Sequence, residues 1–181
     1  MNFISLKNQR DLIGDIVIYP LKVNRDGRGI LVETLKTSWP EVFSGSRPFA
    51  QNYYSITNAG VARDEETWHY HPDQEDRFIV VKGDIVVAIY DWRKDSSTNG
   101  KLNLFKMGEK EGDDGQYLLL IPSNTLHGFC VVSKEPAILL NFPTLLYNPE
   151  EEGRISHQEA GVKLPDGGPF SWGLVRKEFR L

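Results

Sequence analysis

The chain has 181 residues, of which 40% are hydrophobic and 25% are charged, and its formal net charge is -4 at pH 7. These values are typical of one globular domain spanning residues 1–181, and the negative charge argues against nucleic acid or an anionic membrane as a partner. A single cysteine, the lack of a signal-peptide pattern and the lack of an apolar run of about 18 residues favour a cytoplasmic protein with no membrane partner.

Apolar runs bounded by turn residues predict strands along most of the chain. In chain order we expect them near residues 16–21, 30–34, 49–57, 68–71, 77–82, 85–92, 102–107, 117–121, 128–132 and 137–142. Almost no stretch has the 3.6-residue period of a helix, which indicates an all-β sandwich or barrel. The tail from residue 143 to residue 181 is rich in glycine and proline, and we expect it to be irregular apart from one short helix.

The histidines are concentrated in one pattern. His69 and His71 are two residues apart, so on a strand their side chains point to the same face. An acid, Asp76 or Glu75, follows them, and His127 stands at the mouth of a later strand. This spacing resembles that of the cupins, and the resemblance implies a jelly-roll β-barrel whose interior holds these side chains. His157, the fourth histidine, lies in a polar tail and is expected to be solvated.

Two chemistries fit this group of residues. Histidines His69, His71 and His127, with Asp76 or Glu75, offer the imidazole and carboxylate ligands of a transition metal. Alternatively, a histidine without a metal is a base that can remove a proton from carbon beside a carbonyl at neutral pH. Inversion of that carbon then needs an acid on the opposite face of the substrate. The residues alone leave both chemistries open.

A wider set of motifs resembles one family within the cupins, that of the dTDP-4-dehydrorhamnose 3,5-epimerases, and runs in the right order from about residue 11 to residue 155. The motifs are Asp26–Glu33, Gln51-Asn52, Trp68-His69-Tyr70, Val80–Ile85 with Asp91-Trp92-Arg93, Ile121–Phe129, and Tyr147-Asn148-Pro149 with Glu152-Gly153.

The resemblance implies a base, His69, that acts without a cofactor or metal. It also implies a substrate shell consisting of Arg28, Glu33, Gln51, Asn52, Arg77, His127 and Asn141. The expected substrate is a dTDP-, GDP- or CDP-linked 4-keto-6-deoxyhexose, which would be epimerised at C3, C5 or both through an enolate. Such a reaction supplies sugars for surface polysaccharide such as the O-antigen of lipopolysaccharide, and the family implies a homodimer that exchanges N-terminal strands.

The chain departs from the family at three functional positions. Counting back from Thr144 places Asn141, and counting forward from His127 places Leu140, where the family has its catalytic tyrosine. Neither residue can act as that acid, so we expect Tyr53, Tyr54 or a held water to be the only replacements. Asp76 stands at the position of a lysine, and Glu66 at that of a phosphate-binding arginine. The alternatives to an epimerase are therefore a metal-dependent cupin enzyme using His69, His71, Asp76 and His127, and a sugar-binding cupin without catalysis.

Overall fold

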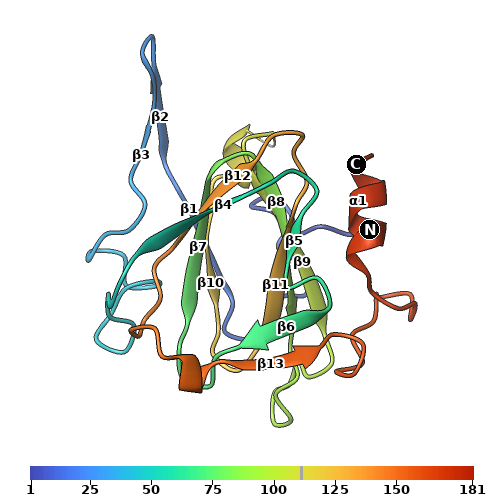
Figure 1. Cartoon of the computed structure of the whole chain (residues 1–181). Helices are drawn as coiled ribbons and strands as arrows, with labels where there is room; N and C mark the ends of the chain where they lie inside the picture. The colour runs from blue at the N-terminus through green and yellow to red at the C-terminus, as the bar shows by residue number, and fades with distance from the viewer. Residues whose placement is uncertain (111) are drawn as a thin grey trace.

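The computed structural model describes residues 1–110 and 112–181, and antiparallel strands make up most of it (Figure 1). The strands are β1 (Val17–Pro20), β2 (Val23–Asp26), β3 (Gly29–Val32), β4 (Tyr53–Thr57), β5 (Ala62–Arg63), β6 (Thr67–Tyr70), β7 (Asp76–Lys82), β8 (Asp84–Tyr90), β9 (Leu102–Gly108), β10 (Tyr117–Ile121), β11 (Leu126–Val131), β12 (Ala137–Asn141) and β13 (Gly153–Ser156). Two 3-10 helices cover Gly112–Gly115 and Pro149–Glu151, and one α-helix, α1, covers Trp172–Glu178. The all-β class and the short helix near the end of the tail are confirmed.

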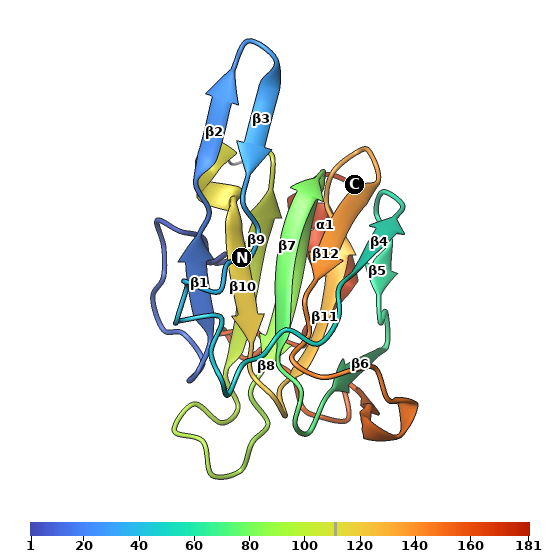
Figure 2. The same ribbon diagram turned by 90° about the vertical axis from the view of Figure 1, so that its left-hand side faces the viewer.

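Two sheets face each other as in a jelly roll (Figures 1 and 2). One sheet has the order β1-β10-β7-β12-β4, and the other has the order β13-β6-β11-β8-β9 with β5 paired to β11. Phe78, Val80, Ile85, Phe105 and Leu119 belong to the buried cluster between the sheets. Because side chains alternate along a strand, each strand of this interior also sends residues to the outer face of its sheet.

The strands β7 and β8 belong to different sheets, and a single glycine joins them. Gly83 has a φ of +73°, and a Cβ atom there would lie 2.9 Å from the backbone Cα atom of Ala137. Glycine is the residue that reaches this backbone conformation without strain, and its missing side chain leaves room for the neighbouring strand. The turn predicted at Lys82-Gly83 is therefore the corner between the two sheets.

The outer face of the second sheet is covered by the tail. Trp68 is fully buried there, with ring centroids 5.1 Å from Phe170 and 5.8 Å from Trp172. His157 belongs to the same aromatic group and is only 4% exposed, so the expectation that it is solvated is wrong. The reason is that β13, which pairs with β6, carries the chain from the polar segment back onto the sheet.

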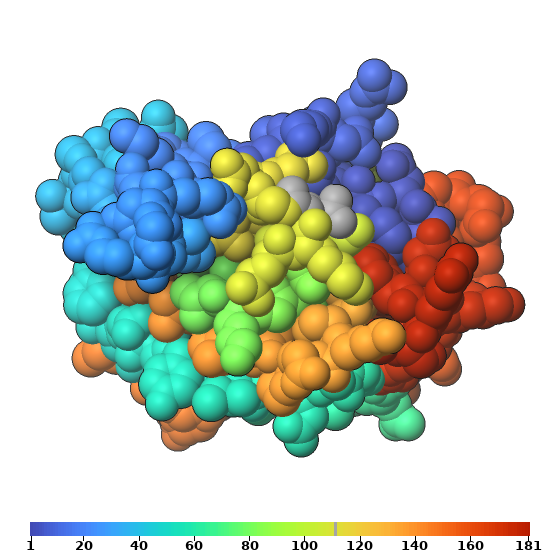
Figure 3. Space-filling view, turned by 90° about the horizontal axis from the view of Figure 1, so that it is seen from above, coloured from blue at the N-terminus to red at the C-terminus, as the bar shows by residue number. Residues whose placement is uncertain are grey.

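The strands β2 and β3 form a two-stranded hairpin that projects from the body of the molecule (Figures 1 and 2). Seen from above, the hairpin and α1 lie on opposite sides of the molecule (Figure 3). Ile30 and Leu31 on the hairpin are 53% and 63% exposed. No helix in the part of the chain that the structure describes is long and apolar enough to cross a membrane.

Candidate functional site

The histidine strand β6 presents two chemically different faces. Trp68 and Tyr70 point to the aromatic cluster under the tail, and the alternation sends His69 and His71 to the interior. His127 on β11 is the cross-strand partner of His69, so that pairing brings the third histidine to the same place. The imidazole centroids of His69 and His127 are 4.2 Å apart. The sequence pattern and the register together thus gather three histidines at one end of the interior.

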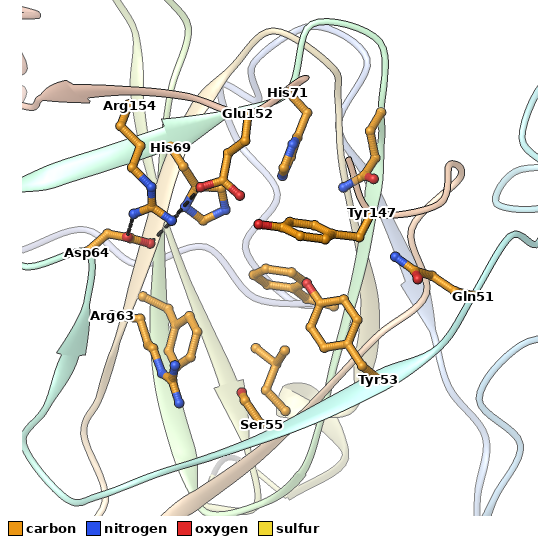
Figure 4. Close-up of a pocket in the computed structure, with 14 residues that line it drawn as sticks. Gln51, Tyr53, Ser55, Arg63, Asp64, His69, His71, Tyr147, Glu152 and Arg154 are labelled. Carbon is orange, nitrogen blue, oxygen red and sulfur yellow. Dashed lines mark hydrogen bonds and ion pairs between the residues drawn. The ribbon is translucent and has the colours of Figure 1, made fainter. Parts of the chain in front are cut away.

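A pocket of about 350 Å³ opens above the histidines (Figure 4). Its volume lies within the range of small-molecule sites. Both sheets contribute to its lining: His69 and His71 come from one sheet, and Tyr53 and Ser55 come from β4 of the other. The remaining lining residues used below are Gln51, Arg63, Tyr147, Glu152 and Arg154.

His69 is oriented by a carboxylate. Its Nδ1 atom lies 2.7 Å from Oδ2 of Asp64, and the other carboxylate oxygen of Asp64 accepts from Arg154 (Figure 4). Burial raises the pKa of Asp64, but the bonds to His69 and Arg154 outweigh it and leave that pKa below its ordinary value. Asp64 therefore stays an anion that holds hydrogen on Nδ1, which leaves the Nε2 lone pair of His69 available.

Asp64 adopts a left-handed backbone conformation with a φ of 64°. Such a conformation is uncommon outside glycine, although aspartate and asparagine tolerate it better than most residues. It places the carboxylate beside an imidazole that is five residues further along the chain. No motif in the sequence singles out Asp64, because no spacing rule points to a partner reached through a left-handed turn.

Tyr53 lies directly across the ladder from Asn141, in the sheet opposite His69. Its hydroxyl oxygen accepts a hydrogen bond of 2.8 Å from Nδ2 of Asn141. Burial, with the negative charge of Asp76 nearby, raises the pKa of Tyr53 to about 12. The phenol is therefore protonated at neutral pH, and because Asn141 donates to its oxygen, its own hydrogen is free to be donated elsewhere.

Asp76 is buried beneath the pocket, 2% exposed. Its Oδ1 atom accepts from Asn141 at 2.8 Å and from Gln74 at 3.0 Å. Burial raises its pKa, but the neighbouring His127 and His71 and the bond from Asn141 outweigh this and hold the pKa at about 2. The carboxylate is therefore an anion in the interior, and it faces the imidazoles rather than solvent.

Burial lowers the pKa of both His71 and His127. His127 lowers the pKa of His71 further, His69 lowers that of His127 further, and Asp76 offsets part of both effects. The Nδ1 atom of His127 lies 3.1 Å from the carbonyl oxygen of Thr125, which can only accept a hydrogen bond. Nδ1 therefore carries the hydrogen, and in neutral His127 the lone pair is on Nε2.

The structure brings together part of the predicted substrate shell. Gln51 lines the pocket, and His127 and Asn141 lie directly beneath it with their polar atoms turned toward Asp76 or Tyr53. Asn52 is exposed and donates to the backbone carbonyl of Asn141 at 3.4 Å. The strand expected from residue 49 begins at Tyr53, so Gln51 and Asn52 belong to an irregular segment at the pocket mouth.

Three other residues of the predicted shell lie outside the pocket of this chain. The guanidinium of Arg77 projects from the outer face of β7 and donates to backbone carbonyls of Arg47, Pro48 and Phe142. Arg28 pairs with Asp26 on the projecting hairpin, and Glu33 pairs with Lys36 beyond it. The alternation of β7 explains Arg77, because its neighbours Asp76 and Phe78 occupy the interior face.

Sequence reasoning did not assign four of the residues that build the site. Asp64, Glu152 and Arg154 form a chain of ion pairs behind His69 and at the pocket rim, and Tyr147 points its hydroxyl into the pocket (Figure 4). Glu152 and Tyr147 lie within motifs recognised in the sequence, whereas Arg154 reaches the site through β13, a strand that was not predicted.

The two facing sheets and the pocket between them place the protein among the jelly-roll cupins, and comparison with known proteins narrows the class. The family model described as dTDP-4-dehydrorhamnose 3,5-epimerase matches residues 11–169, and the chain belongs to this family of sugar-nucleotide epimerases.

A curated relative agrees with this assignment, and solved structures share the fold. A probable low-salt glycan biosynthesis epimerase, Agl13 of Haloferax volcanii, is 41% identical over 144 residues, which cover 77% of this chain and 86% of the relative. The solved structure of a dTDP sugar isomerase from Desulfovibrio desulfuricans superposes with a TM-score of 0.74 at 23% identity, over 95% of this chain and 96% of the other. The RmlC structure of Legionella pneumophila, in complex with dTDP-4-keto-L-rhamnose, gives a TM-score of 0.71 at 22% identity, over 98% and 97% of the two chains.

Proposed function

We propose that this protein epimerises a nucleotide-linked 4-keto-6-deoxyhexose at C3, C5 or both, for the synthesis of a surface glycan such as an O-antigen. The observation that carries the proposal is a base on one sheet and an acid on the other, His69 and Tyr53, both lining one pocket. Family membership supports the substrate class, and dTDP is the nucleotide to test first, before GDP and CDP. The cytoplasm is the proposed location.

The reaction begins at the base. Nε2 of His69 takes the proton from the carbon beside the keto group, and the electrons of the broken C–H bond move toward the C4 oxygen to give an enolate. Asp64 stabilises the imidazolium that forms and fixes its orientation, since it bonds to Nδ1. Proton transfer of this kind by a positioned group contributes about 10²- to 10⁴-fold in rate.

The acid completes the inversion. Neither Asn141 nor Leu140, the two candidates for the place of the family's catalytic tyrosine, carries a suitable proton, and Asn141 donates to the hydroxyl of Tyr53 on the neighbouring strand. We assign the role of acid to Tyr53, which returns a proton to the substrate carbon from the sheet opposite His69. Solvent then reprotonates Tyr53 and takes the proton from the imidazolium of His69. Tyr54 is 65% exposed, and the alternation of β4 sends it away from the pocket.

The diphosphate of the substrate needs positive charge at the pocket mouth. Arg63 lines the pocket, and its Nε atom donates to Thr57 at 3.2 Å, which fixes the stem of the side chain (Figure 4). We assign the phosphate contact to Arg63, in place of the family's arginine at the position of Glu66. A guanidinium suits phosphate oxygens because it presents parallel N–H donors.

The proposed activity is tested with wild-type protein and a dTDP-linked 4-keto-6-deoxyhexose in heavy water. Proton NMR is expected to show loss of the C3 signal, the C5 signal or both, as deuterium enters, together with new signals from the inverted sugar. A protein that binds the nucleotide sugar but leaves both carbons unlabelled is a sugar-binding cupin. The same experiment with GDP- and CDP-linked sugars identifies the nucleotide.

A homodimer is part of the proposal. The hairpin exposes Ile30 and Leu31, and the edge strand β4 exposes Tyr54 and Ile56, at 65% and 57%. An exposed sheet edge with apolar side chains is a ready pairing surface, and a two-fold axis would let each hairpin cover the β4 edge of the partner. Arg28 and Glu33 would then reach the neighbouring pocket, which makes them substrate contacts across the interface.

Sedimentation equilibrium tests the dimer. At micromolar concentration the wild-type protein is expected to have twice the 20.6 kDa mass of the chain, and the double variant Ile30→Glu, Leu31→Glu is expected to have the mass of one chain. Lys94→Glu, an exposed change in the loop between β8 and β9, serves as the control and is expected to remain dimeric. A wild-type protein that sediments as one chain, or a hairpin variant that remains dimeric, contradicts this arrangement.

A further inference from the structure

Four potential metal ligands converge below the pocket. One ligand atom from each of His69, His71, Asp76 and His127 lies within 4.8 Å of all the others. The two shortest measured approaches are from Oδ2 of Asp76, which lies 3.2 Å from Nε2 of His127 and 3.6 Å from Nε2 of His71. Ligand atoms around a tetrahedral metal with bonds of about 2.1 Å are separated by about 3.4 Å. The two measured distances lie on either side of that value.

The outer atoms of three of these groups, His69, His127 and Asp76, are held by partners of their own. Asp64 holds Nδ1 of His69, the Thr125 carbonyl holds Nδ1 of His127, and Asn141 with Gln74 holds Oδ1 of Asp76. Metal-binding histidines and carboxylates are oriented by outer contacts of this kind. As a result, the remaining nitrogen and oxygen atoms point inward toward one another.

One inward atom lacks a hydrogen-bond partner. Nε2 of His127 is buried and makes no hydrogen bond to any residue the structure describes, although Asp76 Oδ2 lies 3.2 Å away outside hydrogen-bonding geometry. Since Nδ1 of His127 faces the Thr125 carbonyl, Nε2 is the ring nitrogen directed at the carboxylate of Asp76. A metal ion between them would give this nitrogen and the Asp76 oxygen a common partner.

We propose that this cluster binds one divalent transition metal ion through the Nε2 atoms of His69, His71 and His127 and through Oδ2 of Asp76. Three imidazoles with one carboxylate suit zinc, iron, cobalt, nickel or manganese rather than the all-oxygen sites of calcium and magnesium. The proposal shares His69 with the proposed epimerase reaction but stands on the geometry of the cluster. The site would therefore have a metal-bound state in addition to the metal-free state in which the proposed reaction takes place.

The two states exclude each other at one atom. A metal ion on Nε2 of His69 occupies the lone pair that would take the substrate proton, so the metal-loaded protein cannot begin the reaction. Metal binding therefore inhibits the proposed epimerisation, and removal of the ion by a chelator restores it. The metal-free protein is the active form, in agreement with a reaction that requires no cofactor.

Binding is tested with cobalt(II) as the probe, added to chelator-treated protein. Wild-type protein is expected to take up one ion per chain by elemental analysis and to develop visible absorption bands of a coordinated cobalt ion. Asp76→Asn and His71→Ala are expected to weaken binding by at least about 100-fold, since loss of outer partners alone costs about 10- to 100-fold. His157→Asn removes the histidine outside the cluster and is expected to bind as the wild type does; circular dichroism checks that every variant is folded.

The outcomes separate the metal site from the proposed reaction. Absence of cobalt uptake by the folded wild-type protein at micromolar concentration, or equal affinity in wild type, Asp76→Asn and His71→Ala, overturns the site. If cobalt binds but hydrogen exchange at the sugar proceeds at the same rate with and without it, His69 is not a ligand and the four-ligand proposal is overturned. If no form of the protein exchanges, the proposed function fails, and the cobalt titration still decides the metal site.

Discussion

The variant His69→Gln is expected to lose hydrogen exchange at the sugar carbon almost completely. Glutamine keeps similar bulk but has no basic nitrogen, so the lone pair that takes the substrate proton is gone. Loss of a positioned base typically costs about 10²- to 10⁴-fold, and we expect the exchange rate measured by NMR in heavy water to fall by that factor. Substrate affinity, measured by calorimetry, is expected to change far less, because the nucleotide contacts remain.

A matched variant tests the orienting carboxylate. Asp64→Asn leaves the base in place but removes the anion that holds hydrogen on Nδ1 of His69. It is expected to slow exchange less than His69→Gln does, because the imidazole is still present but no longer fixed in one tautomer. Exchange in His69→Gln at the wild-type rate would show that another group removes the proton, and Asp64 would then have no role in the reaction.

The variant Tyr53→Phe is expected to separate exchange from inversion. His69 still removes the proton and can return deuterium from solvent to the same face, so label continues to enter the sugar. Delivery from the opposite face loses its donor, and the rate of inversion is expected to fall by about 10²- to 10⁴-fold. Proton NMR follows both processes in one sample, because exchange removes a signal whereas inversion creates a new one.

Tyr147→Phe is the control for this experiment. Tyr147 also points its hydroxyl into the pocket, but it comes from the loop after β12 and is 65% exposed (Figure 4). Its variant is expected to change inversion and exchange in the same proportion. If Tyr147→Phe uncouples the two processes while Tyr53→Phe does not, the acid is Tyr147. If neither does, a water molecule delivers the proton.

The fold was predictable because its signals are local. Short apolar runs, turn residues and the alternation of β6 predict strands with His69 and His71 on one face, and the structure confirms the all-β class. The alternation rule also separates Asp76 from Arg77, which lie on opposite faces of β7. Because Asp76 faces the interior, the alternation of side chains along β7 places Arg77 on the outer face, away from the pocket.

The rest of the site depends on contacts that no local pattern encodes. Arg154 is 90 residues from Asp64 in the sequence, and Tyr53 is 88 residues from Asn141. The register of β4 against β12 pairs Tyr53 with Asn141, and register is a property of paired strands rather than of one local stretch. From the sequence, Tyr53 and Tyr54 are equal candidates for the acid, and only the fold distinguishes them, because Tyr53 lines the pocket and Tyr54 is exposed.

The packing of Trp68 against the tail also has a consequence for the order in which the protein is made. The ribosome releases Trp68 well before Phe170 and Trp172, which cover it, and 104 residues separate the first and last of these. At a synthesis rate of about 5 to 20 residues per second, Trp68 stays uncovered for roughly 5 to 20 s after the ribosome has made the histidine strand β6. The back of the histidine strand is therefore covered only after the tail has been synthesised.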